Sequence, residues 1–469
     1  MKKRKFSFIT FYHREKKDIF LALLSSALIA SLTYKFNIAP FFAIVPLLTI
    51  VYRRNFKDAL IFSAFTGLVS AIFSFDWVYY YGSSFPLYPT VIALWTVFFT
   101  VFSAATHFLY NRTKIVSLFA APIVWIWLMF MIDITRYGSY IFEFSMYNPT
   151  MAPLIWFIGG RGITFIIIAI NSAVAELIVK KTKASLIIAL LLAASLVACY
   201  VYSNTSEATG EPLNVVLVQG NFEKTWEWRQ KHIEDIFEIY KRLSSDKITD
   251  GLIVWPEHTF PVDIIHYYTN IFDKIKAFVK NSNNYLITGS LVYDNNNPDY
   301  HYDSALLFSP EGNLLDVYKS YAPAYYNEYT LESHESLKLF DIKGKKAGIM
   351  ICAEETNSRT ARDYSKKGAQ FLVSISNDQN FKRGAYLSSL YSNLRAAENY
   401  KYFIRTTNTG ITQIINPYGK AKALEENKRN ILIGEIRLNE HKTFYTKYGD
   451  IPLYLATLLI FVSIKRRGK

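Results

Sequence analysis

Cysteine is almost absent from this chain, which has only Cys199 and Cys352 among its 469 residues. Two thiols cannot build a disulfide framework, so small folds that depend on several disulfides are excluded. Apolar residues are plentiful instead, with 51% hydrophobic and 16% aromatic. The composition is therefore sufficient for several hydrophobic cores.

Acidic residues are scarce outside residues 211–450. The flanking parts of the chain hold 22 Lys and Arg residues against 8 Asp and Glu, whereas residues 211–450 hold 30 of each kind. The net charge of +14 therefore comes entirely from the flanking parts. Because this charge lies at the ends of apolar segments, it indicates membrane topology, and no nucleic-acid partner is expected.

Charged residues are rare in eight apolar segments, which approach the length that crosses a membrane, about 20 residues. Any one of them could be a core helix, but eight, seven of them consecutive, predict a polytopic membrane protein. The segments lie near residues 19–32, 38–51, 59–75, 91–110, 115–131, 163–179, 184–202 and 451–464.

The basic residues are unevenly distributed between the two ends of these segments. Nineteen of the 22 cluster at alternate ends, and only Lys35, Arg136 and Arg161 lie at the others. By the positive-inside rule, both termini are predicted in the cytoplasm and residues 211–450 outside it. The expected organisation is a seven-helix transmembrane domain over 1–203, an extracytoplasmic domain over 211–440, and a closing helix with a basic tail over 450–469.

Residues 211–440 alternate β-type runs with amphipathic helical segments, which is typical of an α/β domain. Helices are predicted at 224–243, 262–280, 358–367 and 385–400. Strands are predicted at 214–219, 252–255, 285–292, 304–308, 347–352, 371–376, 402–406, 412–416 and 431–436. Function in such domains gathers where strands end, and three β-type runs end in reactive side chains, Glu257, Lys319 and Cys352.

These three side chains suit nucleophilic catalysis. A thiol attacks carbonyl carbon as the thiolate, a carboxylate can take its proton, and an ammonium stabilises the oxyanion that forms. The set is self-sufficient, so no metal and no cofactor are expected. Individually each residue could be ordinary, with Cys352 as core filler, Glu257 as a helix cap and Lys319 as a surface lysine. Against core filler, two carboxylates follow Cys352 directly, and buried carboxylates need partners.

A Cys–His dyad is the competing arrangement, and His258 is its nearest candidate. That residue follows Glu257 directly, so it is expected to point to the opposite face if the strand continues. His334 lies in a polar segment and is expected to be exposed to solvent. The carboxylate is therefore favoured as the base.

Five short motifs resemble the nitrilase, or carbon–nitrogen hydrolase, superfamily. They lie at residues 255–257, 318–319, 351–354, 376–378 and 407–412. The resemblance implies an αββα sandwich with a Glu-Lys-Cys triad. The surrounding membrane segments narrow it to the apolipoprotein N-acyltransferase family, and it extends over residues 39–48 and 395–398. The expected fold is thus an α-helical membrane domain of about eight transmembrane helices joined to a nitrilase-like α/β domain.

The resemblance also implies an activity and a location. Cys352 would take a fatty acyl chain from a glycerophospholipid as a thioester, and the chain would pass to the N-terminal amine of a diacylated lipoprotein. Glu257 would be the general base and Lys319 the oxyanion partner, with Glu354 supporting the lysine. The protein is expected in the bacterial inner membrane with its catalytic domain on the periplasmic side, in contact with membrane lipid.

The chain departs from the family pattern at three places. Ala353 stands where the family usually has tyrosine, and Asn380 stands where it has tryptophan. Glu328 is offset by one residue from the additional active-site glutamate of the family. These changes indicate a divergent member with an altered lipid or acceptor preference.

Three tryptophans are candidates for substrate binding. Trp77 lies in an aromatic run over 75–82, which is either a membrane-interface belt or a lipid-facing platform beside a site. Trp226 or Trp228 matches the mobile lid tryptophan of the family.

Two other classes of function stay open. A membrane-anchored amidase or hydrolase, or an acyltransferase with a different acceptor, would use the same thioester. A non-enzymatic lipid-binding or assembly protein would keep the fold without the chemistry. The intact set of Glu257, Lys319 and Cys352 disfavours the last class, and the membrane segments disfavour an amidase for soluble substrates.

Overall fold

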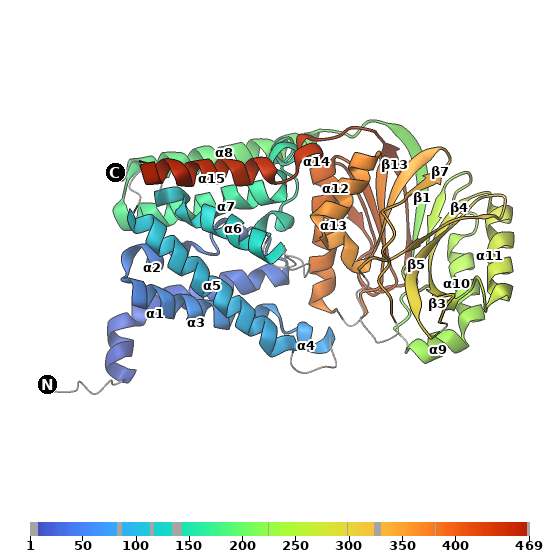
Figure 1. The fold of residues 1–469 in the computed structure, drawn as a ribbon, viewed down its shortest axis with the longest axis horizontal. Helices are drawn as coiled ribbons and strands as arrows, with labels where there is room; N and C mark the ends of the chain where they lie inside the picture. The colour runs from blue at the N-terminus through green and yellow to red at the C-terminus, as the bar shows by residue number, and fades with distance from the viewer. Residues whose placement is uncertain are drawn as a thin grey trace. The chain divides into compact units, whose positions relative to one another are not determined.

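The computed structural model describes residues 8–81, 87–112, 117–133, 143–223, 225–297, 299–322, 330–379 and 381–466. The chain divides into two compact units (Figure 1). The first comprises Met1–Asn148, Gly160–Cys199 and Asp450–Lys469, and the second comprises Pro149–Gly159 and Tyr200–Gly449. The predicted domain over 211–440 lies within the second unit.

The first unit is helical. Its longer elements are α1 (Phe8–Ser31), α2 (Val45–Arg53), α3 (Phe56–Ser74), α5 (Leu87–Arg112), α6 (Ala120–Asp133), most of α7 (Leu154–Lys180) and α8 (Lys183–Thr205), and α15 (Ile451–Arg466). By length and composition, five helical segments suffice to cross a membrane: Glu15–Tyr34, Phe56–Ser74, Leu87–Arg112, Leu154–Lys180 and Lys183–Thr205. Shorter apolar helices lie at Ala39–Arg53, Ala120–Ile132 and Ile451–Ile460. Each predicted apolar segment therefore overlaps an apolar helix.

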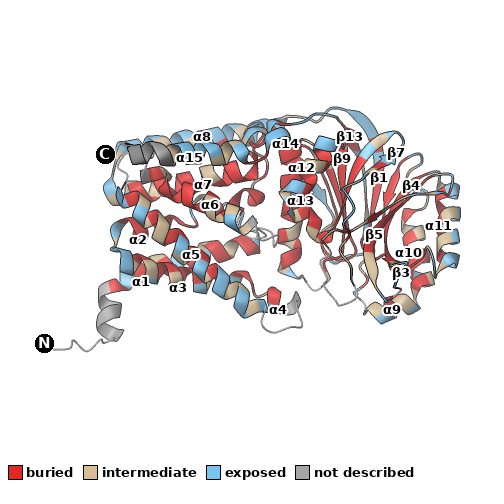
Figure 2. Ribbon diagram, viewed as in Figure 1, coloured by how far each residue is buried: buried red, intermediate tan, exposed pale blue. Residues whose placement is uncertain are grey.

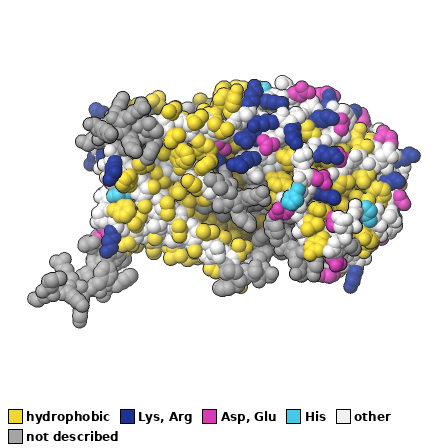
Figure 3. All heavy atoms as spheres, viewed as in Figure 1, with side chains coloured by type: hydrophobic (Ala, Val, Ile, Leu, Met, Phe, Trp, Pro, Cys, Tyr) yellow, Lys and Arg dark blue, Asp and Glu magenta, His cyan; other side chains and the backbone are white. Residues whose placement is uncertain are grey.

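Large apolar side chains cover the outside of these helices. Phe20 is 63% exposed, Leu94 64%, Leu191 65% and Leu459 70%. Figure 3 shows hydrophobic side chains over much of the visible face of this unit, whereas Lys, Arg, Asp and Glu gather over the second unit. An apolar surface of this extent needs a partner other than water, and a bilayer supplies it. The protein is membrane-bound.

The second unit is built on two β-sheets. The first has the order β13 (Asn430–Leu438), β1 (Glu211–Gln219), β2 (Leu252–Val254), β4 (Tyr285–Tyr293), β5 (His301–Phe308), β6 (Leu314–Lys319), with β3 (Phe260–Asp263) paired to β4. The second has the order β12 (Ala421–Ala423), β11 (Gln413–Ile415), β10 (Tyr402–Thr407), β9 (Phe371–Ser376), β8 (Lys345–Ile351), β7 (Leu339–Ile342). Parallel pairing joins β1, β2 and β4 in one sheet and β8, β9 and β10 in the other.

The alternation of side chains along the strands produces a four-layer αββα sandwich. Val215 and Leu217 pack against Ile349 and Ile351 between the sheets, whereas Met350 faces outward. The outer face of the first sheet packs against α10 (Ile233–Ser244) and α11 (Thr269–Ser282). The outer face of the second packs against α12 (Ser358–Lys367) and α13 (Arg383–Asn399). Figure 2 shows the resulting burial along both sheets, and the predicted fold class is confirmed.

One helix prediction was wrong at its start. Residues 260–263 form β3, and α11 begins only at Thr269. Pro261 and the apolar residues after it support an extended edge segment, because proline lacks the amide that a helix interior requires. The predicted helix over 224–243 is divided into α9 (Trp226–Lys231) and α10.

Candidate active site

Cys352 lies on a sharp turn where β8 ends. It is the first residue of a short 3₁₀ helix, η5 (Cys352–Thr356), and its φ of 49° lies in the left-handed region. This conformation costs a non-glycine residue roughly 1–2 kcal/mol, and such strain occurs most often at functional sites. The side chain is 6% exposed. The strand thus ends in a buried thiol held in a strained backbone conformation.

Glu257 lies beside this thiol on the turn that follows β2. The turn packs directly on the backbone of β4, since a Cβ on Gly289 would lie 2.6 Å from the Pro256 carbonyl oxygen and 2.7 Å from the Glu257 Cα. Neither carboxylate oxygen of Glu257 accepts a hydrogen bond of normal geometry from the described part of the chain. The Cys352 thiol is close enough to interact with this carboxylate. The structure therefore brings together two of the three predicted catalytic residues.

Burial changes the acidity of both groups. It raises the pKa of Glu257 to about 8, and the carboxylates of Asp303 and Asp378 add to the rise while His258 opposes it. Burial also raises the pKa of the Cys352 thiol well above its usual value, together with the negative charge of Glu257. The thiol proton therefore stays on sulfur at rest. A carboxylate with a pKa near 8 is a suitable acceptor for it when a substrate arrives.

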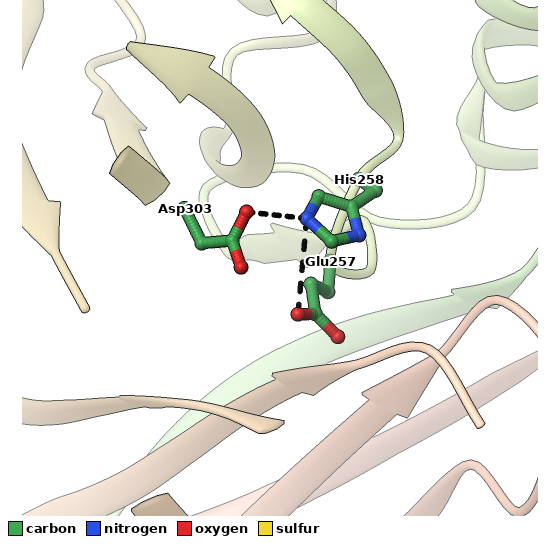
Figure 4. Close-up of side chains that lie close together, drawn as sticks. All are labelled: Glu257, His258 and Asp303. Atoms are coloured by element: carbon green, nitrogen blue, oxygen red, sulfur yellow. Dashed lines mark hydrogen bonds and ion pairs between the residues drawn. The ribbon is translucent and has the colours of Figure 1, made fainter. Parts of the chain in front are cut away.

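His258 is closer to Glu257 than strand alternation predicted. Because β2 ends at Val254 and His258 has a φ of 49°, the expected alternation does not continue to this residue. Its Nε2 atom lies 2.5 Å from Oδ1 of Asp303 and 3.9 Å from Oε1 of Glu257 (Figure 4). The strand does not continue to His258, so the condition for its pointing to the opposite face is not met. No sequence pattern pointed to Asp303, which lies 45 residues further along the chain.

The same three side chains have the donor types of a metal site. Their ligand atoms lie within 4.8 Å of one another and all three residues are buried. Two ligands of one tetrahedral zinc ion, each at about 2.0–2.2 Å, would however be about 3.4 Å apart. The 2.5 Å contact between His258 and Asp303 is shorter than that. The geometry fits a charged hydrogen bond better than shared coordination.

Lys319, the third predicted catalytic residue, ends β6. Its Nζ lies 4.4 Å from the centroid of the Tyr302 ring, in a cation–π contact. It lines a cavity of about 370 Å³ together with Tyr302 and Glu332–Glu335. Within the described ranges, it forms no ion pair with Glu257. The amine is thus placed over the face of the Tyr302 ring.

Glu354 holds the chain on both sides of Lys319. Its carboxylate accepts hydrogen bonds from the Tyr318 hydroxyl (2.8 Å), the Ser320 hydroxyl (2.8 Å) and the Tyr321 amide (2.9 Å). A fourth bond comes from the amide of Ile351 (2.9 Å), next to Cys352. Burial raises the pKa of Glu354 to about 7. This carboxylate therefore connects the end of β6 to the end of β8.

A buried ion-pair network near Cys352 was not predicted. Nε of Arg405 donates to Glu355 at 2.8 Å, and its two terminal nitrogens donate to the oxygens of Asp378 at 3.0 Å each. Ser388 and Ser392 also donate to Glu355, at 2.9 and 2.8 Å. The Arg405 cation opposes the rise in the pKa of Cys352. Asp378 belongs to a recognised motif, but the sequence held no signal that pairs it with Arg405.

The remaining candidates are placed as follows. Trp226 makes an edge contact with the His258 ring, with centroids 4.9 Å apart, whereas Trp228 stacks on His232 at 4.0 Å. Trp226 is therefore the tryptophan next to the Glu257 turn. Trp77 lies in the first unit, half-buried before α4 (Val78–Tyr81). Glu328 lies outside the described residues.

Two family models match the sequence. The carbon–nitrogen hydrolase model matches residues 210–444, which is half of the chain, and the model of the apolipoprotein N-acyltransferase N-terminal domain matches residues 21–173. The matches therefore fall in both units.

Curated relatives and solved structures were compared as well. An apolipoprotein N-acyltransferase of Geobacter metallireducens is 24% identical over 93% of this chain and 92% of its own length. One of Shewanella oneidensis is 28% identical over 69% of each chain. Among solved structures, the carbon–nitrogen hydrolase from Helicobacter pylori matches with a TM-score of 0.42 and 16% identity, over 52% of this chain and 95% of its own.

Proposed function

Since the chain belongs to the apolipoprotein N-acyltransferase family, within the carbon–nitrogen hydrolase superfamily, we propose that it acylates lipoproteins at their N-terminus. The acyl donor is a glycerophospholipid, and the acceptor is the α-amino group of a diacylglyceryl-cysteine. The observation that carries this proposal is the buried Glu257 carboxylate, which accepts no hydrogen bond of normal geometry from the described residues and lies beside the Cys352 thiol. The exposed apolar helices support a reaction between lipid-anchored substrates.

The first half-reaction moves the acyl chain onto the protein. The S–H bond of Cys352 breaks as its proton passes to Glu257, and the thiolate attacks the ester carbonyl carbon of the phospholipid. The tetrahedral intermediate then expels the glycerol oxygen, which takes the proton from Glu257 and leaves as lysophospholipid. Lys319 is proposed to stabilise the oxyanion, which requires its amine to leave the face of Tyr302.

The second half-reaction moves the chain onto the acceptor. The α-amine of the lipoprotein attacks the thioester carbon and loses a proton to Glu257. Collapse of the intermediate breaks the C–S bond, forms the amide and returns the proton to sulfur. The protein ends unchanged, as a ping-pong mechanism requires.

The proposed location follows from the substrates. Both are anchored in lipid, and the basic ends of the apolar segments favour an extracytoplasmic position for residues 211–450. We place the protein in the bacterial inner membrane with its catalytic unit on the periplasmic side. A reporter fused at Lys469 tests this topology. A signal from a reporter that is active only outside the cytoplasm would contradict it.

Intact mass spectrometry of the purified full chain tests the activity. Incubation with a phosphatidylethanolamine of defined chains should add one acyl mass on Cys352, and a diacylated lipopeptide should then remove it. Loss of the added mass to water alone would instead identify the alternative, a membrane-anchored hydrolase of the amidase type. No added mass in wild-type protein would reject both.

A further inference from the structure

A buried histidine–aspartate pair lies next to Glu257, and the acyl-transfer steps above make no use of it. Glu257, His258 and Asp303 are 1%, 4% and 3% exposed. Such complete burial of charge is costly unless the charges are paired. The three side chains in Figure 4 therefore have to be considered as one charged group.

The titratable and charged groups that face His258 come from its own turn, from β5 and from α9. They are Glu257, Asp303, His301 and Arg229. Burial lowers the pKa of His258, but the two carboxylates outweigh burial and the net direction is upward. Arg229 opposes this rise, and its guanidinium donates a hydrogen bond to the His258 carbonyl. The ring of His301 favours its neutral form, since burial lowers its pKa.

We propose that His258, held in its protonated form by Asp303, is a positioning residue that favours ionisation of the Glu257 carboxylate beside Cys352. The inference rests on the proposed role of Glu257 as the base of acyl transfer. It assigns to His258 a cation 3.9 Å from the Glu257 carboxylate, whereas the Lys319 amine makes a cation–π contact with Tyr302.

The physical reason is the charge balance among buried groups. Without the cation, Glu257 and Asp303 would be two neighbouring buried carboxylates, and Glu257 would retain its proton to still higher pH. A protonated Glu257 cannot accept the thiol proton, so the S–H bond of Cys352 would not be broken. With the cation present, the proton moves from sulfur to Glu257 and back, while His258 keeps its own proton throughout.

The test is the pH profile of Cys352 reactivity in full-length protein in detergent, in a Cys199→Ser background. Iodoacetamide alkylation of Cys352 is measured by intact mass, because it needs the base but no lipid substrate. Asparagine is the best replacement for His258, since it tolerates left-handed backbone and its amide can still donate to Asp303. His258→Asn should shift the midpoint of the profile to higher pH by about 1–3 units.

A second substitution separates charge from structure. His258→Asn with Asp303→Asn removes the competing carboxylate, so the midpoint should return toward that of the parent. His266→Asn is the matched control, because His266 also pairs with an aspartate, Asp263 at 2.8 Å, and its side chain is 46% exposed. Its profile should equal that of the parent.

Three results would overturn the inference. The first is a His258→Asn protein that reacts more slowly at every pH with an unchanged midpoint. The second is a double variant that stays as shifted as the single one. The third is a stoichiometric divalent metal ion in the parent that the His258→Asn protein lacks.

A measurement on the parent protein does not depend on the folding of any variant. In ¹⁵N NMR of histidine-labelled protein at pH 7, both ring nitrogens of His258 should be protonated, and a neutral ring would overturn the inference. Failure of the proposed function is recognised separately. A parent that gains no acyl mass from phospholipid, while the alkylation midpoint still shifts in His258→Asn, rejects acyl transfer and keeps the role of His258.

Discussion

Two glutamates, Glu257 and Glu355, lie near enough to Cys352 to raise the pKa of its thiol, and their surroundings differ in kind. Glu355 is fully buried, and its carboxylate accepts from Arg405, Ser388 and Ser392. Glu257 is equally buried, but its oxygens accept no hydrogen bond of normal geometry from the described residues. A satisfied carboxylate holds structure, whereas an unsatisfied one is free to take a proton.

The difference indicates that the surroundings of Glu257 lower the stability of the fold at a site suited to catalysis. Burying a carboxylate without donors costs free energy, and such costs gather at functional sites. The Arg405 network shows that this domain can satisfy buried acids fully when no reaction is required of them. The lack of a normal hydrogen bond to Glu257 from the described residues is therefore informative, and the following experiments test it from the largest expected effect to the smallest.

The Cys352 thiol is expected to be indispensable. Cys352→Ala should abolish acyl-enzyme formation, because the only other thiol of the chain, Cys199, lies in α8 of the membrane unit. Intact mass after incubation with phospholipid measures this. Cys199→Ser is the control and should acylate at the parental rate. If Cys352→Ala retained turnover, Cys352 would not be the nucleophile, and the comparison of Glu257 with Glu355 would have no bearing on catalysis.

Removal of the Arg405 cation, which pairs with Glu355 and Asp378, should destabilise the fold. Arg405→Met leaves Glu355 and Asp378 buried without a counter-charge, a change that typically costs about 3–5 kcal/mol. Thermal unfolding in detergent should show this as a large loss. Arg437→Met is the matched control, since its pair with Glu435 at 2.6 Å is about 40% exposed and is worth about 1 kcal/mol or less. If both variants lost the same amount of stability, burial of the Arg405 ion pairs would not explain the effect.

Substitutions of Lys319 and Glu257 should slow acylation for different reasons. Lys319→Met deletes charge stabilisation in the transition state, worth about 10²–10³ in rate for one donor, and higher pH cannot restore it. Glu257→Gln removes the base, and also one of the charges that raise the pKa of Cys352. Its acylation rate should therefore recover as pH rises. Single-turnover acylation between pH 6 and 10 measures both, and equal recovery would show that the roles are not divided in this way.

Strand ends could be read from the sequence, but the partners of buried charges could not. The short apolar run that ends at Ile351 predicted β8 and its thiol, and the run 252–255 predicted the placement of Glu257. These are local patterns, since short apolar runs of this kind are typical of buried strands. Arg405, in contrast, lies 50 residues from Glu355 and 27 from Asp378, and no local pattern reports such a pairing.

Backbone turns explain the other differences. His258 and Cys352 both have φ values of 49°, which residue type does not predict for histidine or cysteine. The turn at His258 brings a ring to Glu257 that strand alternation had assigned to the other face. The orientation of Lys319 toward Tyr302 depends on packing between β5 and β6, and the sequence pattern fixed only its position at a strand end.

The smallest expected effect is on the stability of the folded protein. Near pH 8 it should rise when Glu257 is replaced by glutamine and fall when Glu355 is replaced. The pKa of Glu257 is raised from 4.5 to about 8 in the folded chain. Between these values the unfolded chain binds fewer protons, so this group lowers stability as pH rises through that window. Glu257→Gln lacks this slope. It should unfold at the parental temperature near pH 4 and several degrees higher near pH 8.

Glu355→Gln should do the opposite. Its carboxylate stabilises Arg405, and replacement leaves that cation with one buried partner fewer, at a cost of about 1–3 kcal/mol. Glu435→Gln, a change at a 44% exposed side chain, serves as the control and should leave the unfolding temperature unchanged. If Glu257→Gln were also destabilising at pH 8, its carboxylate would be satisfied in the protein by donors such as bound water. The unbonded oxygens would then have no bearing on catalysis, and the contrast between the two glutamates would fail.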